Sequence, residues 1–280
     1  MATFKKKNIL ITGARFFTAL DLARSLHMAG HEVFVADSHK IHLCALSKCI
    51  TKSFTIPSPR FAFEDFQKKL KEIIIDYQID MVIPIFEETL YLAKAKPNLP
   101  INCEVFCSPL AVLDKLHNKW LFYNLQKNLD IKTIPTKLIQ SEEDLKKIDI
   151  SKDYILKLCY SRGCFFVQKL SKDKPLPSLK IDPDNPYIAQ QWVDGKKYCS
   201  YSVCRDGKVT AHALYSNETE DASYCLNFES LENKKIFQWV KDFAKTMHLT
   251  GQFSFDFIEA ADGSLYVIEC KKIFSKWIKS

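Results

Sequence analysis

The 280-residue sequence lacks any apolar run long enough to cross a membrane. Its uninterrupted apolar runs have the length of single strands, whereas a membrane-spanning helix needs about 18 consecutive apolar residues. The N-terminal segment ATFKKKNIL also lacks the apolar stretch and the cleavage site of a signal peptide. We therefore expect a cytoplasmic protein without a membrane partner.

The C-x-x-C pairs typical of zinc sites are also missing. The ten cysteines never form C-x-x-C, and their gaps of three or four residues fall on apolar, strand-like segments rather than in knuckles. Structural zinc sites normally draw on such pairs. The pattern favours buried, reduced thiols over a zinc site.

The positive charge is not concentrated in one part of the sequence. The formal net charge of +7 is spread over short lysine clusters, and no basic stripe is interleaved with aromatic residues. Nucleic-acid binding is therefore not expected, whereas a small anionic ligand such as a nucleotide is compatible with the charge. A content of 47% hydrophobic and 26% charged residues is typical of a globular protein, and the length suffices for two modest domains.

Strands and helices alternate in the first part of the chain. The segment KNILIT (7–12) predicts a buried strand, and after it come a turn at Gly13, a helix closed by Gly30 and a second strand, EVFVAD (32–37). This alternation predicts a Rossmann-like domain, residues 1–109, whose parallel sheet is covered on both faces. The further expected elements are a helix at 63–78, a strand at 81–86, a helix from Glu87 or Glu88 and a strand at 104–108.

The first turn, TGARFFTA, does not contain the G-x-G-x-x-G fingerprint of dinucleotide-binding proteins. A helix N-terminus at this turn would hold an anion with the help of Arg15, or the turn simply packs the helix on the sheet. Glu87 and Glu88 follow a strand at the edge where parallel sheets build their crevice. Acidic residues also occur there because they complement the helix dipole.

Strands dominate the second half, after a helix expected from Leu110 to Leu129. Asp206-Gly207 and Asp262-Gly263 each predict a two-residue hairpin turn, and a helix is expected from 229 to 249. The segment 171–186 contains four prolines and reads as a loop. Residues 110–280 are therefore expected to form a separate α+β domain.

Two carboxylates flank the second hairpin turn. Asp256 and Glu269 are equally far from Asp262-Gly263, so a two-residue turn would place them opposite each other with Cβ atoms roughly 5 Å apart. Facing carboxylates attract a cation, and Mg²⁺ completes its octahedron with waters and substrate phosphates. The alternative is that both side chains merely reach solvent.

The order of these segments resembles the ATP-grasp superfamily. The match runs nearly end to end through HNKW, YILKLCYSRG, YIAQQWVDG and the hairpin FDFIEAADGSLYVIEC. ILITGAR, GHEVFVADS, LHNK and CSYSV…GKVTAHA resemble the carbamoyl-phosphate-synthase-like members. The resemblance implies an N-terminal pre-ATP-grasp domain, an ATP-grasp domain with a lid at about 132–190, and ATP-dependent formation of an acyl phosphate that an amine attacks.

The resemblance also implies site residues. Lys119 and Lys157 correspond to the two lysines that neutralise phosphates, and Arg162 of the same lid segment joins them as a catalytic candidate. Asp256 and Glu269 correspond to the Mg²⁺ ligands. The hinge QQWVDG corresponds to the adenine-binding segment, which makes adenine contacts of Gln190, Gln191, Trp192 and Val193. The implied partners are ATP, Mg²⁺ and a small carboxylate or amine substrate near Arg15, Glu87 and Glu88, and a homodimer is left open.

The sequence departs from the family where the chemistry is expected. Glu269 is followed by Cys-Lys-Lys-Ile instead of x-N-P-R, and Lys197 stands where an acid usually holds the ribose. The lid segment SRGC keeps only Gly163, and the chain ends eleven residues after Glu269, where relatives continue with a helical segment. The resemblance therefore implies a C-terminal truncation.

Three hypotheses follow. The first is an ATP-dependent carboxylate–amine ligase. The second is a non-catalytic remnant in which Lys271 replaces the metal, because strand alternation puts Lys271 on the same face as Glu269. The third is a dinucleotide-binding oxidoreductase, which the missing glycine fingerprint disfavours.

Overall fold

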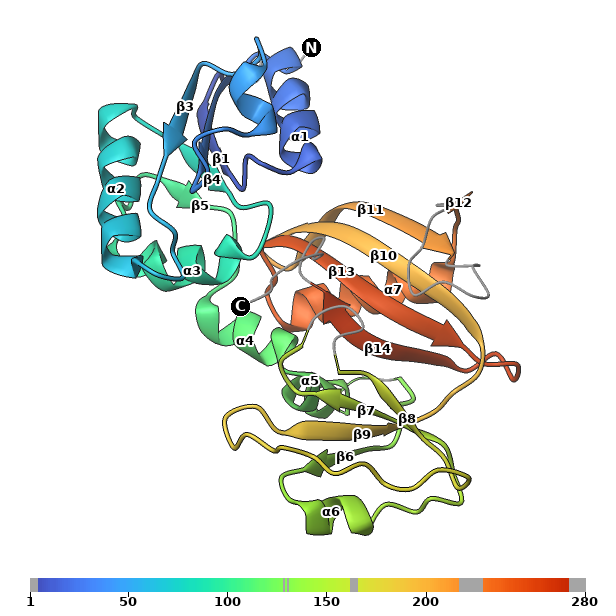
Figure 1. Ribbon diagram of the computed structural model, residues 1–280. Helices are drawn as coiled ribbons and strands as arrows, with labels where there is room; N and C mark the ends of the chain where they lie inside the picture. Colours follow the sequence, from blue (N-terminus) through green and yellow to red (C-terminus); the bar gives the residue numbers. More distant parts are fainter. Residues whose placement is uncertain (1–4, 128, 130, 162–165, 217–228, 272–280) are drawn as a thin grey trace. The chain divides into compact units, whose positions relative to one another are not determined.

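The computed structural model describes residues 5–127, 129, 131–161, 166–216 and 229–271. The chain divides into two units, Met1–Leu110 and Ala111–Ser280 (Figure 1).

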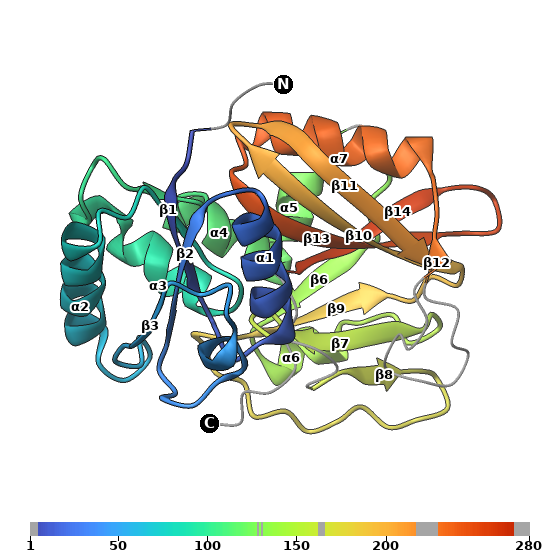
Figure 2. The same cartoon turned by 90° about the horizontal axis from the view of Figure 1, so that it is seen from above.

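The first unit is built on a five-stranded parallel sheet. Its elements are β1 (Asn8–Thr12), α1 (Phe17–Met28), β2 (Glu32–Asp37), η1 (Leu43–Leu46), β3 (Lys52–Thr55), α2 (Phe63–Asp76), β4 (Met81–Ile83), α3 (Glu88–Ala95), η2 (Lys96–Asn98) and β5 (Glu104–Val105). The strand order is β3-β2-β1-β4-β5, and α1 and α2 lie on opposite faces (Figures 1 and 2). The parallel α/β sheet expected from the alternating pattern is confirmed.

A glycine is required at the turn between β1 and α1. Gly13 has φ +73°, in the left-handed region, and a Cβ added there would lie 2.9 Å from Oε1 of Glu88. Neither the backbone conformation nor the space suits a side chain. The turn is therefore a close approach between the backbone and the Glu88 carboxylate.

Two antiparallel sheets form the second unit. Its elements are α4 (Leu110–His117), α5 (Lys119–Gln126), β6 (Thr136–Ile139), α6 (Glu142–Lys146), β7 (Tyr154–Leu158), β8 (Gln168–Leu170), β9 (Tyr187–Gln191), β10 (Lys196–Arg205), β11 (Lys208–Ser216), β12 (Glu229–Ser230), α7 (Lys234–Thr246), β13 (Gly251–Glu259) and β14 (Leu265–Lys271). The four-stranded sheet has the order β6-β9-β7-β8, and the five-stranded sheet the order β12-β11-β10-β13-β14. The expected α+β character is confirmed.

Helix α7 covers one face of the antiparallel five-stranded sheet of the second unit (Figure 2). Alternate residues of β13, Phe253, Phe255 and Phe257, are fully buried on that face. The Phe255 ring packs against Trp239 and Phe243 of α7, with centroids 5.2 and 5.5 Å away. Because strand side chains alternate, the intervening residues of β13 lie on the opposite face.

The helix expected from Leu110 to Leu129 is interrupted. Asn118 separates α4 from α5, and its Oδ1 accepts hydrogen bonds from the backbone N–H groups of Trp120 (3.0 Å) and Leu121 (3.1 Å). An asparagine side chain satisfies the unpaired donors of a helix start in this way. The prediction of one continuous helix was wrong, and the break makes Lys119 the first residue of α5.

The hairpin at Asp206-Gly207 is confirmed. Arg205 pairs with Lys208, and both loop residues have positive φ, +49° and +77°. Such turns match the twist of the strands they join. The C-terminal helix is shorter than the predicted limits, since it starts at Lys234 behind an Asn233 cap.

We expect Phe255→Ala to lower the free energy of unfolding by about 3–5 kcal/mol, because it removes a fully buried ring and leaves a cavity under α7. Urea denaturation followed by circular dichroism measures the change. Phe61→Ala is the matched control, since Phe61 is 82% exposed, and should change the value by less than about 0.5 kcal/mol. Equal losses in the two variants would contradict the packing described here.

Candidate functional site

Asp256 and Glu269 are cross-strand partners, as the sequence predicts, but the loop and the strand register that pair them differ from the predicted ones. The loop has three residues, because the N–H of Ala260 bonds to the carbonyl of Ser264 and that of Gly263 to the carbonyl of Ala260, both at 2.9 Å. That loop alone would pair Asp256 with the wrong residue. A β-bulge between Asp256 and Phe257 adds one residue to β14 and restores the pairing.

The two carboxylates lie on the face of the sheet away from α7. Cys199 of β10 is the other cross-strand partner of Asp256, and its thiol donates to Oδ1 of Asp256 at 3.2 Å. Cys199, Asp256 and Glu269 therefore occupy one rung across β10, β13 and β14. The sequence analysis missed Cys199, because β10 and β13 are not joined by a short turn that would fix their register.

The buried ammonium group of Lys119 lies at the same site. Its Nζ donates to the backbone carbonyl of Ser161 at 2.9 Å and contacts the Ser161 hydroxyl at 3.1 Å. Oε2 of Glu269 lies 3.7 Å from this nitrogen, and the Lys119 side chain is only 8% exposed. The N–H of Lys119 also bonds to the carbonyl of Cys159 at 3.0 Å, just beyond β7. The first residue of α5 thus places its ammonium group beside Glu269, a candidate metal ligand.

Lys157 projects from β7 beside a buried amide. Its Nζ donates to Oε1 of Gln190 at 3.2 Å, and Gln190 is 6% exposed. Because the backbone contact of Lys119 lies two residues beyond Lys157, the two candidate phosphate-binding lysines belong to one region of the second unit.

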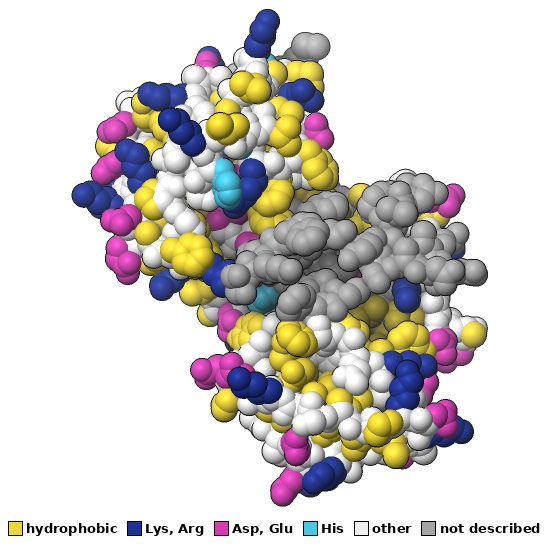
Figure 3. Space-filling view, viewed as in Figure 1, with side chains coloured by type: hydrophobic (Ala, Val, Ile, Leu, Met, Phe, Trp, Pro, Cys, Tyr) yellow, Lys and Arg dark blue, Asp and Glu magenta, His cyan; other side chains and the backbone are white. Residues whose placement is uncertain are grey.

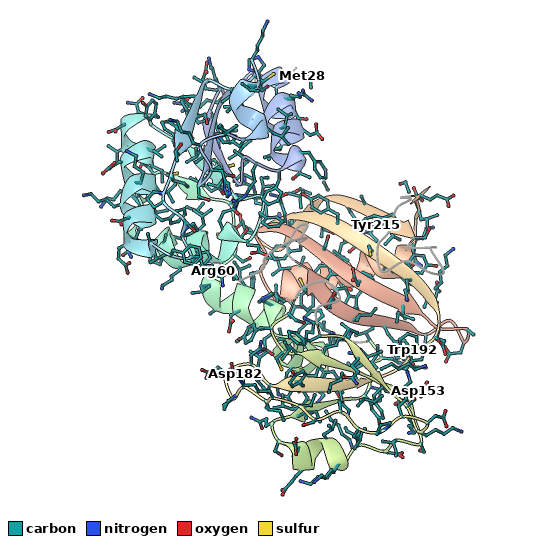
Figure 4. All side chains as sticks on the ribbon, viewed as in Figure 1. Met28, Arg60, Asp153, Asp182, Trp192 and Tyr215 are labelled. Carbon is teal, nitrogen blue, oxygen red and sulfur yellow. The ribbon has the colours of Figure 1, made fainter. Side chains whose placement is uncertain are left out.

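Two backbone N–H groups of the hinge after β9 form hydrogen bonds within the protein. The N–H of Gln191 bonds to the carbonyl of Pro135 at 2.9 Å, and the N–H of Trp192 to the carbonyl of Asp153 at 2.8 Å. Figure 4 shows Trp192 and Asp153 close together at one end of the four-stranded sheet. Both donors are therefore used within the protein.

In the first unit, the Glu88 carboxylate is drawn inward. Its Oε1 accepts hydrogen bonds from the Thr12 hydroxyl (2.7 Å) and from the N–H groups of Ile85 and Phe86 (both 3.2 Å). Burial raises the pKa of this carboxyl above its ordinary value. The contacts join the ends of β1 and β4, where the strand order reverses, while Glu87 is half-buried beside it.

Arg15 is tied to the end of β2. One guanidinium nitrogen lies 3.6 Å from Oδ1 of Asp37 and 2.7 Å from Nδ1 of His39, and the backbone N–H of Arg15 donates to Oδ2 of Asp37 at 2.9 Å. The fully buried Asp37 side chain thus orients Arg15. The sequence analysis did not assign this role to Asp37.

Some predicted residues cannot be placed. Arg162 and the Lys271 side chain lie outside the described residues, although the backbone of Lys271 pairs with Ser254. Among the described side chains, the Lys119 ammonium lies 3.7 Å from Oε2 of Glu269.

A search of the described ranges finds no group of three His, Cys, Asp or Glu side chains arranged for a metal ion. No helix among them is long and apolar enough to span a membrane. Acidic and basic side chains are interspersed on the face shown in Figure 3.

Burial raises the pKa of the thiols of Cys44, Cys159 and Cys204 to about 11, which keeps them protonated.

Comparison with known proteins places this arrangement in context. Residues 116–271 match the ATP-grasp domain family. The chain superposes on the L-amino acid ligase of Bacillus licheniformis with a TM-score of 0.71 and 16% identity, covering 97% of this chain and 68% of that chain. The N5-carboxyaminoimidazole synthetase of Staphylococcus aureus, solved with ADP, gives 0.71 and 15%, covering 97% and 72%. The biotin carboxylase of Campylobacter jejuni gives 0.73 and 15%, covering 97% and 66%.

We expect Lys119→Met to lower the free energy of unfolding by about 1–3 kcal/mol, because it removes a buried cation 3.7 Å from the Glu269 carboxylate. Adding Glu269→Gln should recover about 1 kcal/mol, a coupling that a double-mutant cycle of urea denaturation measures. Lys115→Met is the control, since Lys115 is exposed on α4. Strict additivity of the two substitutions would show that the pair does not interact.

The buried carboxyl group of Glu88 makes the stability of the protein depend on pH. The pKa of Glu88 is raised in the folded state, so the folded form binds the proton more tightly than the unfolded form. Stability is then full at low pH and is lost as the pH rises above the ordinary value of 4.5 towards the folded-state pKa. Glutamine stays neutral and still offers an acceptor oxygen, so Glu88→Gln should be more stable than the unsubstituted chain at neutral pH.

Urea midpoints at pH 5 and pH 8 test this expectation. Glu64→Gln, at an exposed position of α2, should follow the unsubstituted chain at both values. Parallel midpoints for Glu88→Gln and the unsubstituted chain would rule out the raised pKa.

Proposed function

Because the chain belongs to the ATP-grasp family, we propose that it binds ATP with Mg²⁺ and acts as an ATP-dependent carboxylate–amine ligase. The observation that carries the proposal is the placement of the Lys119 ammonium 3.7 Å from Glu269, whose cross-strand partner is Asp256. A cation for phosphate and two oxygen ligands for a metal are thus gathered at one place.

The proposed reaction has two steps. A carboxylate oxygen of the substrate attacks the γ-phosphorus of ATP, and the bond to the ADP oxygen breaks, giving an acyl phosphate. The amine nitrogen then attacks the acyl carbon, inorganic phosphate leaves, and the amine loses a proton. The lysine ammonium groups of Lys119 and Lys157, with Arg162, would neutralise the phosphate oxygens during the first step.

The carboxylates of Asp256 and Glu269 fit a hard cation. Two oxygen ligands on neighbouring strands suit Mg²⁺, which usually keeps waters and takes further oxygens from substrate phosphates. When bound, Mg²⁺ would supply charge neutralisation at the phosphates.

The adenine base is proposed to bind at the hinge formed by Gln190, Gln191, Trp192 and Val193. The N–H groups of Gln191 and Trp192 bond to Pro135 and Asp153, so the base would meet other groups of the hinge. We further propose that residues 1–109 are a pre-ATP-grasp domain and 110–280 the ATP-grasp domain, with a lid at about 132–190. The substrate would meet Arg15, Glu87 and Glu88 at the strand ends of the first unit.

A second candidate function is a nucleotide-binding or structural remnant without catalysis. The observation that favours it is the segment Glu269-Cys270-Lys271-Lys272-Ile273, which has no side-chain oxygen after Glu269 to serve as a further metal ligand. We further propose a carbamoyl-phosphate-synthase-like character and a cytoplasmic location as parts of the ligase proposal, which leaves a homodimer open.

Thermal denaturation with ATP tests the binding step. We expect millimolar ATP to raise the melting temperature, and Mg²⁺ to increase the rise, because a ligand that binds only the folded state stabilises it. Asp256→Asn should abolish the Mg²⁺-dependent part while leaving part of the ATP effect. Lys157→Met should weaken both effects, and Lys137→Met, at an exposed position of β6, should weaken neither.

The two candidate functions give different results. A ligase releases inorganic phosphate from ATP when the matching carboxylate is supplied from a panel of carboxylates and amines. A remnant that still binds nucleotide shifts the melting temperature without Mg²⁺ dependence and releases no phosphate. No shift at millimolar ATP would end the ligase proposal.

A further inference from the structure

Gln190 and Thr136 form a buried polar chain that ends at a candidate phosphate-binding lysine. Nζ of Lys157 donates to Oε1 of Gln190 at 3.2 Å, Nε2 of Gln190 donates to the Thr136 hydroxyl oxygen at 3.3 Å, and that hydroxyl donates to the carbonyl of Ile134 at 2.8 Å. Gln190 and Thr136 are only 6% and 7% exposed. Both ends of the amide are therefore engaged inside the protein.

The strand register explains how these side chains meet. Thr136 of β6 lies opposite Gln190 of β9, and Gln190 lies opposite Ile155 of β7. Directly opposed residues share a face, and Lys157 follows Ile155 by two positions, so all of these side chains lie on one face. The other face of the sheet packs its apolar residues, such as Leu156 and Ala189, into the core. The polar chain is thus set apart from that core.

The direction of the hydrogen bonds fixes the amide. The single hydroxyl proton of Thr136 goes to the carbonyl of Ile134, so its oxygen can only accept from Gln190. The amide must then turn its NH₂ group to Thr136 and its oxygen to Lys157. The Gln190 oxygen thus fixes the direction of one N–H group of the Lys157 ammonium.

We propose that Gln190 is a positioning residue, held by Thr136, that aims the Lys157 ammonium at the phosphates of a bound nucleotide. This inference rests on the proposed function and revises one part of it, because the Gln190 side chain acts on the phosphate end of the nucleotide and not on the adenine. The backbone of Gln190 remains part of the hinge.

Binding of ATP and of adenosine distinguishes the two roles. Gln190→Leu should weaken ATP binding about tenfold, the value of one charge-assisted hydrogen bond, and leave adenosine binding unchanged. Thr136→Val should weaken ATP binding in the same direction by a smaller factor. Gln140→Leu, an exposed position directly after β6, is the matched control and should change neither. Calorimetry measures ATP, and competition against a fluorescent nucleotide measures adenosine.

A double-mutant cycle tests whether Gln190 acts through Lys157. In a Lys157→Met background, Gln190→Leu should cause no further loss of ATP affinity. A further tenfold loss, or equal losses for ATP and adenosine, would overturn the positioning role while ATP binding itself stands. Failure of the unsubstituted chain to bind ATP would overturn the proposed function and this inference together.

Circular dichroism and melting temperature verify that each variant folds. Thr136→Val keeps the shape and volume of the side chain, so it carries the ATP-against-adenosine comparison alone if Gln190→Leu does not fold. Unchanged ATP affinity in a folded Thr136→Val variant would count against the inference.

Discussion

The buried ammonium of Lys119 is the contact on which the second unit's site depends. It bonds to the carbonyl of Ser161 beyond β7 and lies 3.7 Å from Glu269 on β14, while α5 itself packs against β6 and β14. A charge that is 8% exposed is costly to bury unless acceptors surround it. The requirement for those acceptors joins the helix to both sheets of the unit.

The same contact connects stability with ligand binding. The Lys119 ammonium lies 3.7 Å from Glu269, and the Cys199 thiol donates to Asp256, so both candidate metal ligands contact protein groups. The proposed binding of ATP would act on these contacts. A phosphate and a divalent cation arriving together would exchange these contacts for new ones of the same sign. A metal ion arriving without phosphate would instead meet Lys119 as a competing cation, which favours joint binding of metal and nucleotide.

Sequence reasoning reached the Asp256–Glu269 pair because a hairpin ties register to the turn. The predicted pair was correct although the predicted loop was not. A three-residue loop followed by a β-bulge pairs Asp256 with Glu269 just as a two-residue turn without a bulge would. The break at Asn118 had a local signal, an asparagine before a helical segment, that was overlooked. The Gln190 contacts had none, because Thr136 and Lys157 are 54 and 33 residues away along the chain.

The partner of Lys157 bears on the choice between ligase and remnant. Gln190 accepts a hydrogen bond from the Lys157 ammonium, and the Thr136 hydroxyl fixes the orientation of the Gln190 amide. All three contacts lie within β6, β7 and β9 and the residue Ile134 just before β6, so none of them depends on the residues after Glu269. The proposed positioning of Lys157 is therefore compatible with the altered segment after Glu269, and ATP binding can be tested independently of catalysis.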